Sequence, residues 1–147
     1  MAFKRVIIRR VGPLFWLLCT AMKISSVFIV TLTLLVSHQI DAAYWKEWEM
    51  FHLPGGIQFF DIFNLALIPV LLVGLRAVIL RQRSGYIHSL FASFLGVLTF
   101  LIHAGFYLFG YQQFNLPVSA SIIVGCGVSG LVQFYFTFKS RKDFGSA

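Results

Sequence analysis

Four long apolar runs constrain this chain more than any other feature of the sequence. They cover residues 24–40, 57–80, 86–110 and 117–138. About 20 helical residues cross the hydrocarbon core of a bilayer, and each run is close to that length. In lipid only helices and closed barrels satisfy the backbone hydrogen bonds, and continuous runs of this length indicate helices. The sequence therefore predicts an all-α integral membrane protein.

The composition excludes a soluble domain and a nucleic-acid-binding module. The 147 residues are 59% hydrophobic and only 12% charged, with a mean hydropathy of +0.84. A soluble domain of this size needs a larger polar surface. The net charge of +7 does not indicate nucleic acid, because the basic residues lie at the ends of apolar runs. Cys19 and Cys126 both lie in apolar segments, which is typical of small buried hydrophobes.

Short connections between the runs predict the topology. Residues 81–85 join the second and third runs, and residues 111–116 join the third and fourth. Helices joined by short loops lie antiparallel, so we expect a four-helix up-down bundle. Residues 41–51 contain no helix breaker and predict a short interfacial helix after the first span. The sequence Pro54-Gly55-Gly56 ends that segment.

Basic residues at the ends of the runs give the expected orientation. They cluster before the first span, between spans two and three, and after span four: Lys4, Arg5, Arg9, Arg10, Lys23, Arg76, Arg81, Arg83, Lys139, Arg141 and Lys142. On the other side of the membrane, the segments between the spans hold one basic residue, Lys46. The positive-inside rule then predicts cytoplasmic termini, with residues 139–147 as a basic tail. We expect a multi-pass protein of the bacterial inner membrane.

Residues 1–23 have three interpretations. A basic start and an apolar core suggest a signal peptide, although "CTAM" is a poor cleavage site. The segment can also extend the first helix into the cytoplasmic interface. The third interpretation, which we favour, is that translation starts at Met22, which leaves one four-span domain over residues 24–138.

The stretch "SHQIDAAYWKEWEMF" (residues 37–51) holds three of the five acidic residues. Tyr44, Trp45 and Trp48 are predicted to anchor it at the membrane–water boundary, where aromatic residues with polar tips are enriched. Behind them, Glu47, Glu49 and His52 form a predicted lid over the outer end of the bundle.

Polar residues inside the spans predict a cluster beneath this lid. His38 and Asp41 are three residues apart and share one helical face, as do Asp61 and Asn64 in the second span. His103 lies seven residues before Gly110, about 10 Å below the outer boundary. Ionisable residues in spans usually face the interior of a bundle, so we expect these five side chains to converge.

Three roles fit the predicted cluster. His38, His103, Asp41 and Asp61 can bind a divalent metal ion such as zinc. Histidine can also relay protons near neutral pH, and a buried hydrogen-bonded network can hold helices together. The spacing matches no HExxH motif, so we assign no cofactor and no catalytic residue, and we favour the structural role.

Small residues along spans three and four predict close helix packing. They are Ser89, Ser93, Gly96, Thr99, Ser121, Gly125, Ser129 and Gly130, followed by Gln133. Small residues four apart let helix backbones approach closely. The alternative is that span four binds a second copy or another membrane protein.

The outer stretch, followed by "LPGGIQFFDIFN", resembles a family of short bacterial inner-membrane proteins classed as a domain of unknown function. The resemblance covers residues 22–138, and its matching positions are His38, Asp41, Trp45, Glu47, Trp48, Gly55 and Gly56. Members of such a family start near the equivalent of Met22. The resemblance implies a class of protein and no mechanism.

A looser similarity, in outline only, is to the four-span emopamil-binding and sigma-2 receptor group, whose members hold a sterol-like ligand inside the bundle. The residues favour a non-enzymatic small-ligand binder or accessory membrane subunit. The alternative is a membrane enzyme or carrier that uses the His/Asp cluster on a metal, a proton or a lipid-like substrate.

Overall fold

The computed structural model describes residues 24–111 and 113–145. The three interpretations of residues 1–23, including translation from Met22, lie outside these described residues, and so does Cys19.

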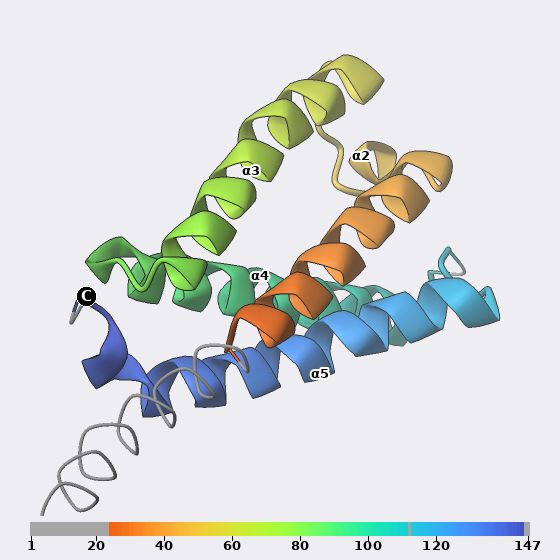
Figure 1. Ribbon diagram of the computed structural model, residues 1–147. Coiled ribbons are helices and arrows are strands. Elements are labelled where there is room, and N and C mark those ends of the chain that lie inside the picture. Colours follow the sequence, from red (N-terminus) through yellow and green to blue (C-terminus); the bar gives the residue numbers. More distant parts are fainter. Residues whose placement is uncertain (1–23, 112, 146–147) are drawn as a thin grey trace, which may run out of the picture.

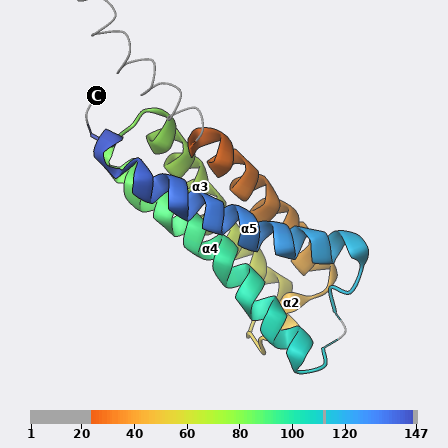
Figure 2. The ribbon, with the colours of Figure 1, turned by 90° about the horizontal axis from the view of Figure 1, so that it is seen from below.

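Four long helices make up most of the described chain. They are an unlabelled first helix, Ile24–Tyr44, which we call the N-terminal span, and α3 (Gly56–Ile79), α4 (Arg83–Leu108) and α5 (Pro117–Lys139). Each is long and apolar enough to cross a membrane. The predicted class, an all-α membrane bundle, is confirmed. Figures 1 and 2 show α4 and α5 lying side by side.

Small residues bring α4 and α5 into backbone contact. A Cβ atom on Gly96 would lie 2.7 Å from the Cys126 carbonyl oxygen, and one on Gly130 would lie 2.7 Å from that of Ser93. Such close approach is typical of helix pairs in membranes. The predicted packing role of these glycines is confirmed, whereas docking of a second copy or partner through span four stays a prediction.

Buried polar side chains add hydrogen bonds along the same interface. The Ser93 hydroxyl donates to the Gly130 carbonyl at 2.7 Å, and the Gln133 amide donates to the Ser89 carbonyl at 3.0 Å. Ser89 and Thr137 share a hydroxyl–hydroxyl bond of 2.7 Å. These bonds satisfy polar groups that lipid would leave without partners.

A break after the N-terminal span positions the next segment. Lys46 has a φ of 52°, in the left-handed region, and the one-turn helix α2 (Glu47–Met50) follows it. The sequence predicts one uninterrupted helical stretch over residues 41–51, and the structure divides it at residues 45–46. In Figure 1, α2 lies between the neighbouring ends of the N-terminal span and α3. The turn therefore folds α2 across that end of the bundle.

The C-terminal segment packs at the opposite end. The Gly145 amide donates to the Arg81 carbonyl at 2.8 Å, and an Arg81 guanidinium nitrogen lies 3.9 Å from an Asp143 carboxylate oxygen. Asp143 belongs to the short helix η1 (Arg141–Asp143) that follows α5. The α3–α4 connection and the basic C-terminal segment therefore share one end of the molecule.

Candidate functional site

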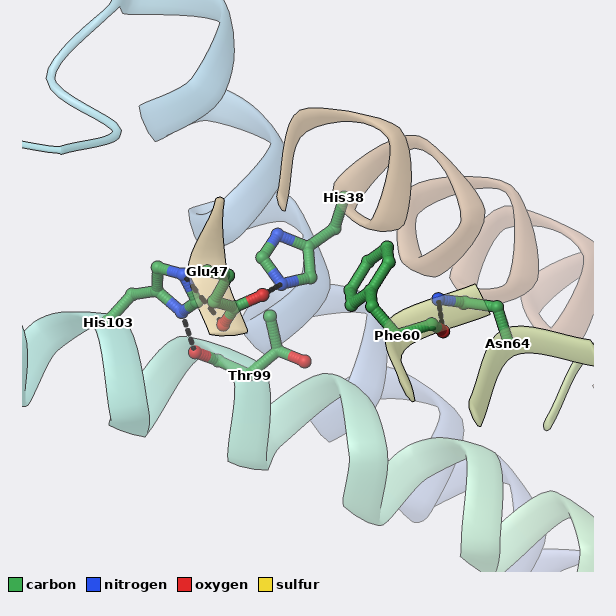
Figure 3. A network of polar contacts seen from close by, with 6 residues as sticks. All are labelled: His38, Glu47, Phe60, Asn64, Thr99 and His103. Atoms are coloured by element: carbon green, nitrogen blue, oxygen red, sulfur yellow. Dashed lines mark hydrogen bonds and ion pairs between the residues drawn. The ribbon is translucent and has the colours of Figure 1, made fainter. Parts of the chain in front are cut away.

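Three side chains from three separate elements meet at the α2 end of the bundle. His38 comes from the N-terminal span, Glu47 from α2 and His103 from α4 (Figure 3). The two carboxylate oxygens of Glu47 each face one imidazole, at 3.7 Å from His38 Nε2 and 3.5 Å from His103 Nε2. We call these three residues the triad.

The triad is buried, and its surroundings fix the orientation of the rings. His38, Glu47 and His103 are 3%, 8% and 6% exposed. Nδ1 of His103 lies 2.9 Å from the Thr99 carbonyl oxygen. A carbonyl only accepts, so Nδ1 carries the proton and Nε2 presents a lone pair toward Glu47. The Phe114 ring packs edge-on against His103, with a centroid distance of 4.4 Å.

The carboxyl group of Glu47 has an unusual electrostatic environment. Its burial, and then the negative charge of Asp41, raise the pKa of Glu47 from 4.5 to about 7. Burial acts in this direction because it disfavours the charged form. Asp41 is itself held by the Ser119 hydroxyl, which donates to it at 3.0 Å from α5. Glu47 can therefore exchange a proton near neutral pH.

The triad forms the polar end of a cavity of about 320 Å³. The N-terminal span, α3 and α4 line the cavity mainly with leucine and phenylalanine side chains, and α2 contributes Glu47 and Trp48. The Trp48 ring rests against Phe60 of α3, with centroids 5.4 Å apart. Gln39 and Thr99 are the remaining polar lining residues among those described. The cavity thus combines an apolar body with one polar end.

The structure brings together part of the predicted polar cluster. The rings of His38 and His103 meet edge to face with centroids 4.8 Å apart, and Asp41 is close enough to influence the pKa of Glu47. Asp61 is exposed and does not line the cavity. The Asn64 amide donates to the Phe60 carbonyl of its own helix at 3.0 Å (Figure 3). Phe60 lines the cavity, whereas Asn64 does not.

The three residues predicted to form a lid do not act together: one is buried in the site and two are exposed. Glu47 lies inside the site, not above it. Glu49 is exposed and lies 3.7 Å from Lys46, and His52 is exposed with a φ of 53°. Within this segment only Glu47 faces the two histidines.

The three aromatic residues predicted as membrane anchors also occupy different environments. Tyr44 is 73% exposed, as an anchor at the membrane boundary requires. Trp45 packs on Phe114, with ring centroids 5.9 Å apart, and Trp48 lines the cavity. Two of the three aromatic residues therefore help to build the site.

Two residues of the site were not expected from the sequence. Thr99 orients His103 through its carbonyl group, and the signal was their spacing of four residues on one helix. Phe114 is 5% exposed and has a φ of 64°. It lies in the loop between α4 and α5, and no pattern in the sequence marks it as buried.

The arrangement has two chemical capacities. A carboxylate between two imidazoles can bind a cation or accept a proton, and the apolar cavity can hold a hydrocarbon body.

In comparisons with known proteins, a family model described as a family of unknown function, DUF6713, matches residues 24–140. No curated protein and no solved structure matches the chain.

Proposed function

This chain belongs to the DUF6713 family of unknown function, and on that premise we propose that it binds one small amphipathic, lipid-like molecule within the membrane. The observation that carries the proposal is the cavity beside the triad. Ligand sites usually measure about 300–1,000 Å³ and combine apolar walls with a few polar groups. At about 320 Å³, this cavity suits a small ligand.

The mouth of the cavity supports entry from the lipid. Four aromatic or aliphatic lining residues are also exposed by more than a third: Phe51, Leu53, Phe59 and Phe63. They belong to the segment that follows α2 and to the first half of α3. A ligand that is dissolved in the bilayer would meet these side chains first and then place its polar group at the triad.

Glu47 favours a second candidate function, a membrane enzyme or carrier. A general base is most effective when its pKa lies near the working pH, and the pKa of Glu47 is raised to about 7. It faces the same cavity as the proposed ligand. The triad would then move a proton to or from the polar group of a bound lipid-like substrate.

The ligand proposal is tested by filling the cavity. Leu67 lines the cavity from α3. In the Leu67→Trp variant, the bulkier indole side chain would occupy part of the cavity. We expect the wild-type chain, purified in mild detergent, to carry one amphipathic molecule in native mass spectrometry. The Leu67→Trp variant should retain at least about tenfold less, a loss of about 1.4 kcal/mol in binding.

Leu65→Trp is the matched control, because Leu65 lies on the same helix, is 77% exposed and does not line the cavity. It should retain the ligand as the wild type does. A wild-type chain with no bound molecule, or equal retention by both variants, would contradict the proposal.

We also propose that both termini are cytoplasmic, in a bacterial inner membrane. The positive-inside rule supports this orientation, since Arg81 lies beside the basic C-terminal segment at one end of the bundle. In a chain without other cysteines, Glu49→Cys should react with a membrane-impermeant maleimide in spheroplasts. Lys142→Cys should react only after permeabilisation. The opposite labelling pattern would reverse the orientation.

A further inference from the structure

We propose that the triad, His38, Glu47 and His103, binds one divalent transition-metal ion, and that zinc fits the site best. This inference rests on the triad alone and goes beyond the proposed ligand binding, since it holds whether or not the cavity takes up a lipid-like molecule.

The spacing of the three ligand atoms fits a shared ion better than direct hydrogen bonds. The Glu47 oxygens lie 3.7 and 3.5 Å from the two Nε2 atoms, whereas charge-assisted N–H···O bonds measure about 2.7–2.9 Å. Zinc–nitrogen and zinc–oxygen bonds are about 2.0–2.2 Å long, so two ligands of one tetrahedral zinc ion lie about 3.3 Å apart. Both distances, each to a different oxygen of Glu47, are within about 0.5 Å of that separation.

The largest separation among the ligand atoms sets how far the site has to close. All three ligand atoms lie within 4.8 Å of one another, and the longest bonds to one ion span at most about 4.2 Å. The ligand atoms that lie farthest apart therefore have to approach each other by up to about 0.6 Å to hold one ion.

The orientation of His103 matches that of a metal ligand. Its Nδ1 donates to the Thr99 carbonyl at 2.9 Å, and its Nε2 is buried without a hydrogen-bond partner in the described part of the chain. Metal-binding histidines commonly donate their second ring nitrogen to a carbonyl or carboxylate, which fixes the tautomer. The His103 lone pair is therefore directed at the centre of the triad.

The local charge also favours a cation. Among the described residues, the side chains within 4.0 Å that could carry a balancing charge for Glu47 are the two histidines, and no lysine or arginine is among them. Asp41 adds a second carboxylate close by, with Oδ2 buried and without a hydrogen-bond partner in residues 24–111 or 113–145. Buried carboxylates are costly unless they are paired or coordinate a metal. A divalent ion would balance both negative charges.

Two imidazoles and one carboxylate are a donor set that three-ligand zinc sites use, with a fourth position left for water or a substrate. All three residues line the cavity, so the fourth position would face the bound molecule. The ion would then interact directly with the polar group of a lipid-like ligand.

The test uses the full chain, purified in detergent without an affinity tag and stripped with a chelator. Zinc should bind at one ion per chain in native mass spectrometry and elemental analysis, and cobalt(II) should give the visible spectrum of a tetrahedral nitrogen–oxygen site. Loss of a second-shell partner lowers metal affinity by about 10–100-fold. Glu47→Gln and His103→Gln each remove a ligand and should weaken zinc binding by at least about 100-fold.

The chain offers a control for each variant. Glu49 shares α2 with Glu47 but is exposed. His88 shares α4 with His103 and makes the same ring contact to the carbonyl four residues earlier, at 2.8 Å, but it lies outside the triad. Glu49→Gln and His88→Gln should bind zinc as the wild type does.

Zinc binding weaker than millimolar by the wild type, or equal binding by the triad variants and their controls, would overturn the metal site. Glu47→Gln keeps the shape of the side chain, and circular dichroism checks that each variant is folded. Ligand retention is measured separately on the stripped protein, so failure of the metal site and failure of the proposed ligand binding give different results.

Discussion

Replacing Gly96 by leucine is expected to lower the free energy of unfolding by about 3 kcal/mol, since overpacking a close contact costs about 1–3 kcal/mol and leucine adds four carbon atoms. The first of them would lie 2.7 Å from the Cys126 carbonyl oxygen. That obstacle is a backbone atom, so no side-chain rotation can relieve the overlap and α4 and α5 would have to separate. Thermal unfolding in detergent measures the effect.

Gly105→Leu is the matched control, because Gly105 lies on the same helix and a Cβ atom there would meet nothing within 4 Å. Both substitutions raise helix propensity by up to about 1 kcal/mol, so their difference isolates the contact between the helices. Equal melting temperatures for the two variants would show that α4 and α5 do not pack as described.

In metal-free protein, the contribution of Glu47 to stability should fall as the pH rises from 4.5 to about 7, because Glu47 binds its proton more tightly in the folded state. At Glu47 the folded chain binds more of the proton than the unfolded chain throughout this window, and each unit of pKa difference corresponds to about 1.4 kcal/mol. The total contribution of Glu47 is about 3 kcal/mol, present below pH 4.5 and lost above about pH 7.

The measurement compares unfolding of the wild type and Glu47→Gln between pH 4 and pH 8 with a chelator present. His38, Asp41 and His103 lie close to Glu47 and are present in both proteins, so the difference between the two curves reports on Glu47. Glu49→Gln should follow the wild-type curve, since Glu49 is exposed. Parallel curves for the wild type and Glu47→Gln would contradict the prediction.

The four membrane helices could be predicted because lipid leaves few choices. A run of about 20 apolar residues has to satisfy its own backbone, and the helix does so within one segment. Close helix packing along spans three and four was also predicted, since small residues such as Gly96 and Gly130 let another helix approach closely; the structure shows that α4 and α5 pack on each other there. The position of the helices and the presence of small-residue strips both depend on the local sequence and on the lipid solvent. Predicting them requires no knowledge of which residues far apart in the sequence are in contact.

The site was predictable only in part. The depth of His38 and His103 in their spans follows from helical rise, and the structure brings both rings together. The inward position of Glu47 depends on the left-handed turn at Lys46, a conformation that sequence indicates mainly through glycine or asparagine. A lysine gives no such signal. The carboxylate was therefore expected outside the site, and Asp61 was expected in its place.

The short helix α2 has one mechanical consequence. Glu47 and Trp48 are consecutive residues on a single turn. One contributes the carboxylate of the triad and the other rests on Phe60 at the wall of the cavity. A displacement of this turn that moved the indole ring away from Phe60 would also move the Glu47 carboxyl group relative to both histidines. The proposed entry of a ligand and the geometry of the triad would therefore depend on the same four residues.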